Sequence, residues 1–108
     1  MAFHHIRKDE FDQFQPPHLI FEMLMKQQVE WLASPTQDVI GTVAGTADTG
    51  WRFAVLERNP RGHFRIFKLG GSANGIDAAR TQLIKEMELA EQAVQAAARD
   101  PKLAVRKP

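Results

Sequence analysis

The chain has 108 residues, a mass of 12.2 kDa and a formal net charge of +1. This length suffices for one small domain, and so weak a net charge gives no general field to hold a polyanion, so a nucleic-acid contact would require a local patch. The absence of cysteine excludes disulfides, thiolate nucleophiles and cysteine-ligated zinc. No apolar run reaches membrane-spanning length and the first residues are polar, so we expect a cytoplasmic protein without membrane contact.

The first third of the chain is expected to hold an arm and a helix. Residues 1–15 mix phenylalanines with charged side chains and should pack through their aromatic rings. Pro16 and Pro17 can open a helix but cannot lie inside one, so a first helix is expected over residues 18–33. Its apolar arc is wider than one sheet face requires, and packing of the arm is the favoured explanation. A dimer or partner interface is the alternative, with candidate residues Phe21, Met25, Trp31 and Leu32.

Three strands are expected next, the first over residues 38–44. Val39, Ile40 and Val43 supply β-branched bulk, while Gly41 suggests a bend or an edge. The other two strands flank residues 59–62, which fit a type I turn with glycine at the left-handed position. The register that follows pairs Glu57 with Arg65, Leu56 with Ile66, Val55 with Phe67 and Phe53 with Leu69.

This register sorts the hairpin side chains onto two faces of the sheet. The face expected to close the core carries Trp51, Phe53, Val55, Phe67 and Leu69. The second face mixes cations with apolar groups and carries Arg52, Ala54, Leu56, Arg58, Phe64, Ile66 and Lys68. A slip of one residue would mix the two sets, so the pattern favours this register.

A second helix is expected over residues 75–99, because apolar side chains recur there at helical spacing. It would be about 37 Å long against strands of about 23 Å, so its alanine-rich second half should overhang the sheet. We expect an arm at 1–15, one domain at 16–100 and a basic, mobile tail at 101–108. The predicted fold class is α+β, in the order α-β-β-β-α, with two helices packed on one face of a three-stranded antiparallel sheet.

Enzyme motifs are weak in this sequence. None of the histidines falls in an HExxH or comparable zinc-ligand spacing, and neither Ser34 nor Ser72 has the context of a nucleophile elbow. The glycine-rich segment at residues 70–75 lacks the spacing of a phosphate-binding loop. We therefore expect no catalytic residue, cofactor, metal or small-molecule substrate.

The mixed sheet face is the better candidate for function. Its cations can meet phosphates or guanine edges, and an aromatic ring can stack on an unpaired base. The predicted nucleic-acid-binding residues are Arg52, Arg58, Arg61, Phe64 and Lys68. Two alternatives stay open: the cations only solubilise an open sheet face whose apolar groups lie under the arm, or the same face docks a protein.

Four short segments resemble the APETALA/ethylene-response-factor DNA-binding domain over residues 40–82. They are Trp51 at the start of a strand, the turn at 59–62, Leu69-Gly70, and Asp77-Ala78-Ala79-Arg80 at the start of a helix. The resemblance implies three strands and a helix, with DNA contacts from Arg52 and from Arg58 or Arg65. The α-β-β-β-α order also resembles a double-stranded-RNA-binding domain. Asp77 stands where that family has a lysine cluster, so only the topology is carried over.

The sequence thus predicts a small non-enzymatic domain that binds nucleic acid through its sheet face. The alternative is a protein-interaction module or regulator, acting as a homodimer through the first helix and the end of the second. A steep loss of binding with salt would indicate nucleic acid. Loss of binding when apolar helix residues are truncated would indicate a protein partner.

Overall fold

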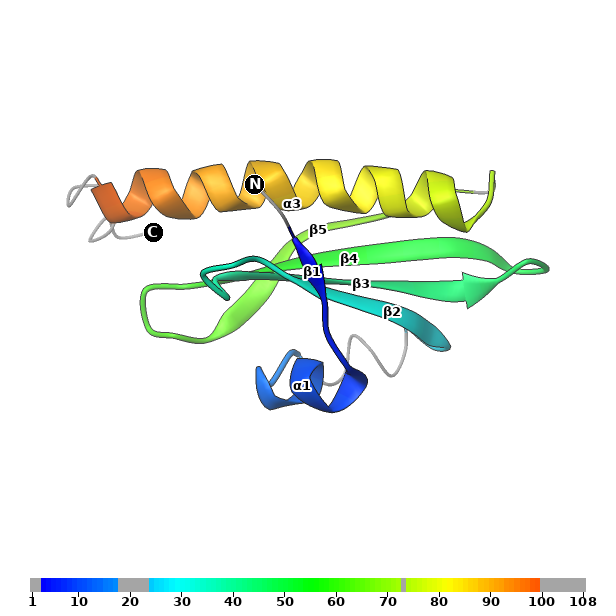
Figure 1. The fold of residues 1–108 in the computed structure, drawn as a ribbon, viewed down its shortest axis with the longest axis horizontal. Coiled ribbons are helices and arrows are strands. Elements are labelled where there is room, and N and C mark those ends of the chain that lie inside the picture. Colours follow the sequence, from blue (N-terminus) through cyan, green and yellow to red (C-terminus); the bar gives the residue numbers. More distant parts are fainter. Residues whose placement is uncertain (1–2, 18–23, 73, 100–108) are drawn as a thin grey trace.

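A computed structural model describes residues 3–17, 24–72 and 74–99. The fold is α+β, as predicted, and a five-stranded antiparallel sheet has its strands in chain order, β1-β2-β3-β4-β5. Figure 1 shows α3 along one face of this sheet and α1 on the opposite face. The elements are β1 His4–His5, α1 Lys8–Gln13, β2 Gln28–Ala33, β3 Val39–Thr46, β4 Gly50–Arg58, β5 Phe64–Ser72 and α3 Ile76–Arg99.

The first predicted helix is wrong over its last six residues, which form strand β2 (Gln28–Ala33). Leu32 packs on the face covered by α3, whereas Trp31 and Ala33 pack on the face covered by α1. A strand buried on both faces is apolar almost continuously, so its sequence resembles a broad helical stripe. The predicted three-stranded sheet is therefore wrong as well. Residues 24–27 of that predicted helix are not helical either, and its first part, residues 18–23, lies outside the described residues.

The face of the sheet under α3, the helix-side face, holds one of two buried clusters. Leu83 and Met87 of α3 pack there against Val43, Phe53 and Val55 of the central strands. Gly41 of β3 allows this approach, because a Cβ at that position would lie only 2.8 Å from both Leu83 Cδ1 and Met87 Sδ. Gly41 thus marks a close contact between helix and sheet, and the predicted edge is wrong, because β3 lies between β2 and β4.

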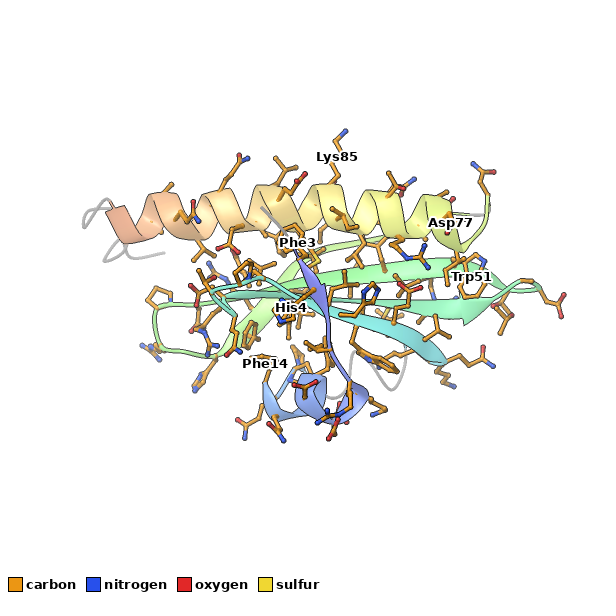
Figure 2. All side chains as sticks on the ribbon, in the orientation of Figure 1. Phe3, His4, Phe14, Trp51, Asp77 and Lys85 are labelled. Atoms are coloured by element: carbon orange, nitrogen blue, oxygen red, sulfur yellow. The ribbon has the colours of Figure 1, made fainter. Side chains whose placement is uncertain are left out.

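The opposite face, the arm-side face, is covered by residues from the N-terminal segment. Phe11 of α1 and Met25 are buried there against Ile40, Leu56 and Phe64. The expectation that both helices cover one face is therefore wrong. The alternative in which the apolar groups lie under the arm is confirmed, because Ala54, Leu56 and Phe64 are all buried. Figure 2 shows Phe14 between α1 and the sheet.

The β4–β5 hairpin follows the predicted register only near its turn. Gly62 has φ +86° and donates its N–H to Asn59 O at 2.9 Å, and Glu57 and Leu56 pair with Arg65 and Ile66 as expected. A bulge then shifts the strands, so the pairs predicted for the far half of the hairpin are wrong. The observed pairs are Val55 with Lys68, Ala54 with Leu69, Phe53 with Gly70, Arg52 with Gly71 and Trp51 with Ser72.

Two side chains account for this shift. Phe67 packs under α3 with the helix-side cluster, so the extra residue of the bulge is anchored in the core. Gly70 lies beside the ring of Phe53, which would overlap a Cβ at that position. The bulge also moves Leu69 away from the predicted core face, and its side chain is 41% exposed.

An ion-pair network ties α3 to strand β2 of the sheet. Arg80 of α3 donates from Nε to Glu30 Oε1 at 2.8 Å and also contacts Glu30 Oε2 and Asp77. These hydrogen bonds lower the pKa of Glu30 below its usual range, because the arginine favours the charged carboxylate and outweighs the effect of partial burial.

Among the described residues, no helix is both long and apolar enough to cross a membrane.

Candidate binding surface at the free edge of the sheet

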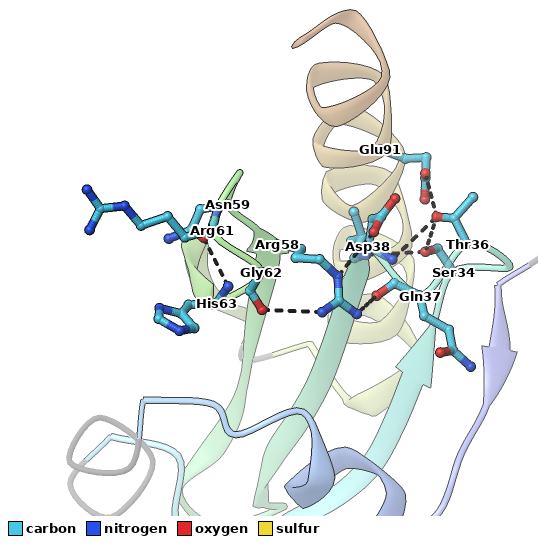
Figure 3. A network of polar contacts seen from close by, with 11 residues as sticks. Ser34, Thr36, Gln37, Asp38, Arg58, Asn59, Arg61, Gly62, His63 and Glu91 are labelled. Carbon is cyan, nitrogen blue, oxygen red and sulfur yellow. Dashed lines mark hydrogen bonds and ion pairs between the residues drawn. The ribbon is translucent and has the colours of Figure 1, made fainter. Parts of the chain in front are cut away.

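Arg58, one of the predicted nucleic-acid contacts, is held by the protein itself. Its guanidinium donates from Nε to Asp38 Oδ1 at 3.2 Å, from Nη2 to Gln37 O at 2.9 Å and from Nη1 to Gly62 O at 3.3 Å, as Figure 3 shows. Its Cζ also lies 4.6 Å from the centre of the Phe64 ring. These contacts clamp the β2–β3 loop to the β4–β5 turn, so Arg58 has a structural role here.

Phe64, the predicted stacking residue, is only 7% exposed. Its ring centre lies 5.3 Å from that of Phe14 in an edge-to-face arrangement, and Arg58 covers it from another side. A ring enclosed in this way presents no free face to a nucleotide base. Arg61 is exposed at the turn, where the Asn59 side chain accepts its backbone N–H at 3.0 Å.

Lys68 and Arg52 lie on different faces of the sheet. Lys68 is exposed and pairs with Val55, whose side chain packs under α3. Arg52 alternates with Ala54 and Leu56, so it lies on the arm-side face at the far end of β4 from Arg58. The structure therefore does not bring the five predicted residues together into one surface.

The alternative interface residues are mostly part of the interior. Met25 and Leu32 are each 2% exposed, and they pack in the two opposite clusters. Trp31 is partly buried and donates from Nε1 to Gln28 Oε1 at 2.7 Å. Phe21 lies outside the described residues. Where they are described, these side chains stabilise the chain's own fold.

A shallow hollow of about 280 Å³ opens beside Arg52, next to the edge strand β5. It is mainly apolar, and two of its side chains are unusually exposed: Leu24 at 46% and Leu69 at 41%. Arg52 is the one charged residue among the described residues that line it. Its Nε is buried without a hydrogen-bond acceptor. Exposed apolar surface and a buried N–H without an acceptor are both unfavourable. A ligand that carries an apolar side chain and a hydrogen-bond acceptor would relieve both costs.

Among the described residues β5 pairs only with β4, so the backbone groups on its outer edge have no strand partner there. The N–H of Arg58 donates to Asp38 O at 2.8 Å, on the side away from β5. Residues alternate along a strand, so Arg52 and Ala54 also direct their N–H groups away from β5. Their partners Gly71 and Leu69 must then direct their N–H and C=O groups to the free edge.

The second half of this edge is open, in contrast to the first. The bulge at Phe67 and the charge of Lys68 protect the first half, as is usual for an edge strand. Gly70 and Gly71 carry no side chain, so nothing on these residues shields the backbone. The Arg52 side chain leans over Gly71, where a Cβ would lie 3.6 Å from Arg52 Cγ.

A second hollow, of about 420 Å³, lies between the end of α3 and the hairpin. Ala93, Val94 and Ala97 form its helix wall, and Phe67 belongs to its opposite wall. The second half of α3, predicted to overhang the sheet, thus lies across this hollow from the β4–β5 hairpin. Two acids and two arginines lie around it, Asp38, Glu57, Arg58 and Arg65, and they pair with each other.

Sequence reasoning identified Arg52 but missed its apolar neighbours. The predicted register places Leu69 in the core, and the predicted first helix includes Leu24. The signal that could have located the site is the Gly70-Gly71 pair, expected to end the third strand but found inside β5, since glycine in a strand often marks a close approach of another backbone.

The fold and this edge surface define the described residues as a small α+β domain whose edge strand β5 is unpaired on one side. No family model, curated protein or solved structure that was compared with the chain matches it.

Proposed function

We propose that this chain is a protein-binding module that adds an extended segment of a partner protein to the free edge of β5. In this mode of recognition, main-chain hydrogen bonds supply affinity and pockets for alternate side chains supply specificity. The observation that carries the proposal is the bare edge at Gly70 and Gly71, next to an apolar hollow lined by Arg52, whose Nε has no hydrogen-bond acceptor.

The open half of β5 has the geometry that strand addition requires. The N–H and C=O groups of Leu69 and Gly71 point outward in one row, at the spacing of a strand ladder. Leu69 is exposed beside the hollow, so an added strand would cover apolar surface as well as forming hydrogen bonds. Both contributions favour a polypeptide as the ligand.

Nucleic acid is supported less well as the ligand. Phe64 is buried and Arg58 is fully engaged, so the aromatic ring and one cation of the predicted surface are occupied. Arg52, Arg61 and Lys68 are the remaining cations of that set, and they are dispersed over two faces and the turn. Single-stranded nucleic acids are generally held by a continuous basic groove with exposed aromatic rings.

Selection from a library of short random peptides displayed on phage tests the proposal. We expect enrichment of peptides that bind in extended form. We also expect chemical versions methylated on alternate backbone nitrogens to lose binding, because methylation removes the ladder hydrogen bonds but keeps every side chain. Failure to enrich any peptide would overturn the proposal.

The same protein should be titrated with labelled single-stranded and double-stranded DNA and RNA at two salt concentrations. We expect little binding even at low salt. Tight binding that weakens steeply with salt would instead establish the nucleic-acid function that the sequence favours.

A further inference from the structure

We infer that the partner segment carries an acidic residue and an apolar residue two positions apart, the acid beside Gly71 and the apolar side chain beside Leu69. This inference rests on the proposed function, because it assumes that a strand is added to β5. It assigns the chemistry of the ligand from the side chains that flank the open edge.

The position beside Leu69 calls for an apolar side chain. Leu69 and Leu24 expose large parts of their surfaces around the hollow, and Met25 and Phe53 form part of its lining. A hollow of about 280 Å³ can accept an aliphatic side chain at its mouth. Burying the facing leucine surfaces then removes apolar area from water, which favours an apolar ligand over a polar one.

The position beside Gly71 calls for an acid. Arg52 pairs with Gly71 across the ladder, and its Cγ lies beside the bare glycine, 3.6 Å from where a Cβ would stand. No acid is among the described residues lining the hollow, and Arg52 Nε lacks an acceptor. A carboxylate on the added strand would reach the guanidinium across Gly71 and could accept two parallel hydrogen bonds.

Strand geometry fixes the spacing of these two residues. Leu69 and Gly71 lie two positions apart, so their neighbours on an added strand are also two positions apart and point to the same face. That face is the arm-side face, where Arg52 and the hollow lie. The acid and the apolar residue would thus be separated by one residue whose side chain points to the helix-side face.

Peptide selection with the wild-type protein tests this directly. The expected result is enrichment of glutamate or aspartate two positions from leucine, isoleucine or valine. In a selected peptide, replacing the acid by its amide should weaken binding about tenfold, the loss expected for a charge-assisted hydrogen bond. Peptides selected without any preference for an acid would overturn this inference and leave strand addition itself intact. Selection of no peptide at all would overturn the proposed function.

Two variants refine the test. Arg52→Gln should bind the acid-containing peptide and its amide version with nearly equal affinity, so the ratio of the two affinities (the acid-to-amide ratio) falls to near one. It should retain the preference for the apolar residue. Arg61→Gln is the matched control, since it removes the same charge from an exposed position at the turn, and it should leave the ratio unchanged. Equal ratios in the wild type and in Arg52→Gln would contradict the role of Arg52. The peptide comparison on the wild type needs no variant, so it stands even if Arg52→Gln folds poorly.

Discussion

Gly41 of β3 lies directly under Met87 of α3, and the hydrogen on its Cα occupies the space where any other residue would place a Cβ. Leu83 covers the same glycine from the preceding turn of the helix. Both helix side chains are fully buried, so the helix rests on the backbone of a central strand. This contact fixes the height of α3 above the sheet, and farther along the helix the second hollow opens near the hairpin.

Gly41→Ala should therefore destabilise the protein by about 1–3 kcal/mol, the usual cost of forcing an extra carbon into a packed core. Urea denaturation followed by circular dichroism measures the change. The double variant Gly41→Ala/Met87→Ala should cost less than the sum of the two single variants, because the shortened side chain makes room for the new methyl group. Additive costs would show that the two residues do not compete for the same space.

We expect Phe64 to stabilise the fold rather than to contact a ligand. Phe64→Ala removes a buried ring between Phe14 and Arg58 and should cost about 3–5 kcal/mol, whereas Phe64→Leu should cost clearly less. Thermal unfolding of both variants provides the measurement. A fully stable Phe64→Ala protein that loses affinity for single-stranded nucleic acid would support the stacking role predicted from the sequence.

The loss of folding stability in acid should depend on Glu30. Its hydrogen bonds from Arg80 lower its pKa in the folded protein, so it stabilises the fold above its ordinary pKa of about 4.5. This contribution is lost as the pH falls from that value through the lower pKa of the folded state. Glu30→Gln should reduce stability by about 1–2 kcal/mol at neutral pH and flatten its decline in acid.

Asp77→Asn is the control for this measurement. Asp77 also contacts Arg80, but its side chain is 91% exposed, and exposed ion pairs contribute little to stability. Urea denaturation between pH 3 and pH 7, a range of about four units chosen around the ordinary carboxyl pKa, separates the two variants. An unchanged acid profile in Glu30→Gln would exclude this residue as the cause.

Self-association through the end of α3 stays a prediction. The hollow beside Ala93 has balanced charges and small apolar side chains, a surface that a twofold-related copy could fill. Light scattering at two protein concentrations should then show a mass that rises toward twice 12.2 kDa. Ala93→Glu should give a monomer, while Ala96→Glu, outside the hollow, should have a smaller effect. A monomer mass at both concentrations would exclude the dimer.

The parts of the fold that were predictable are those set by local chemistry. The type I turn at residues 59–62 and the first pairs of the hairpin depend on residues adjacent in sequence, and the structure confirms them. The long helix also agrees, because its apolar stripe has an unmistakable period. Strand β2 is predicted as a helix, since both of its faces pack against apolar clusters and its nearly continuous apolar sequence resembles a broad helical stripe.

The candidate site could be predicted only in part, for a related reason. The bulge at Phe67 depends on packing under α3 and on the ring of Phe53 beside Gly70, both of which are tertiary contacts. One extra residue then moves Leu69 to the solvent and Lys68 to the other face. Arg52 lies before the bulge, so its predicted face is retained while its partners change.

Backbone amide exchange of β5, measured by nuclear magnetic resonance with and without a selected peptide, tests the central claim most directly. The N–H groups of Leu69 and Gly71 point to the free edge and should exchange slowly only when the peptide is bound. Gly70, whose N–H points toward β4, should change much less. Unchanged exchange at Leu69 and Gly71 in the presence of a saturating peptide would contradict the addition of a strand to β5.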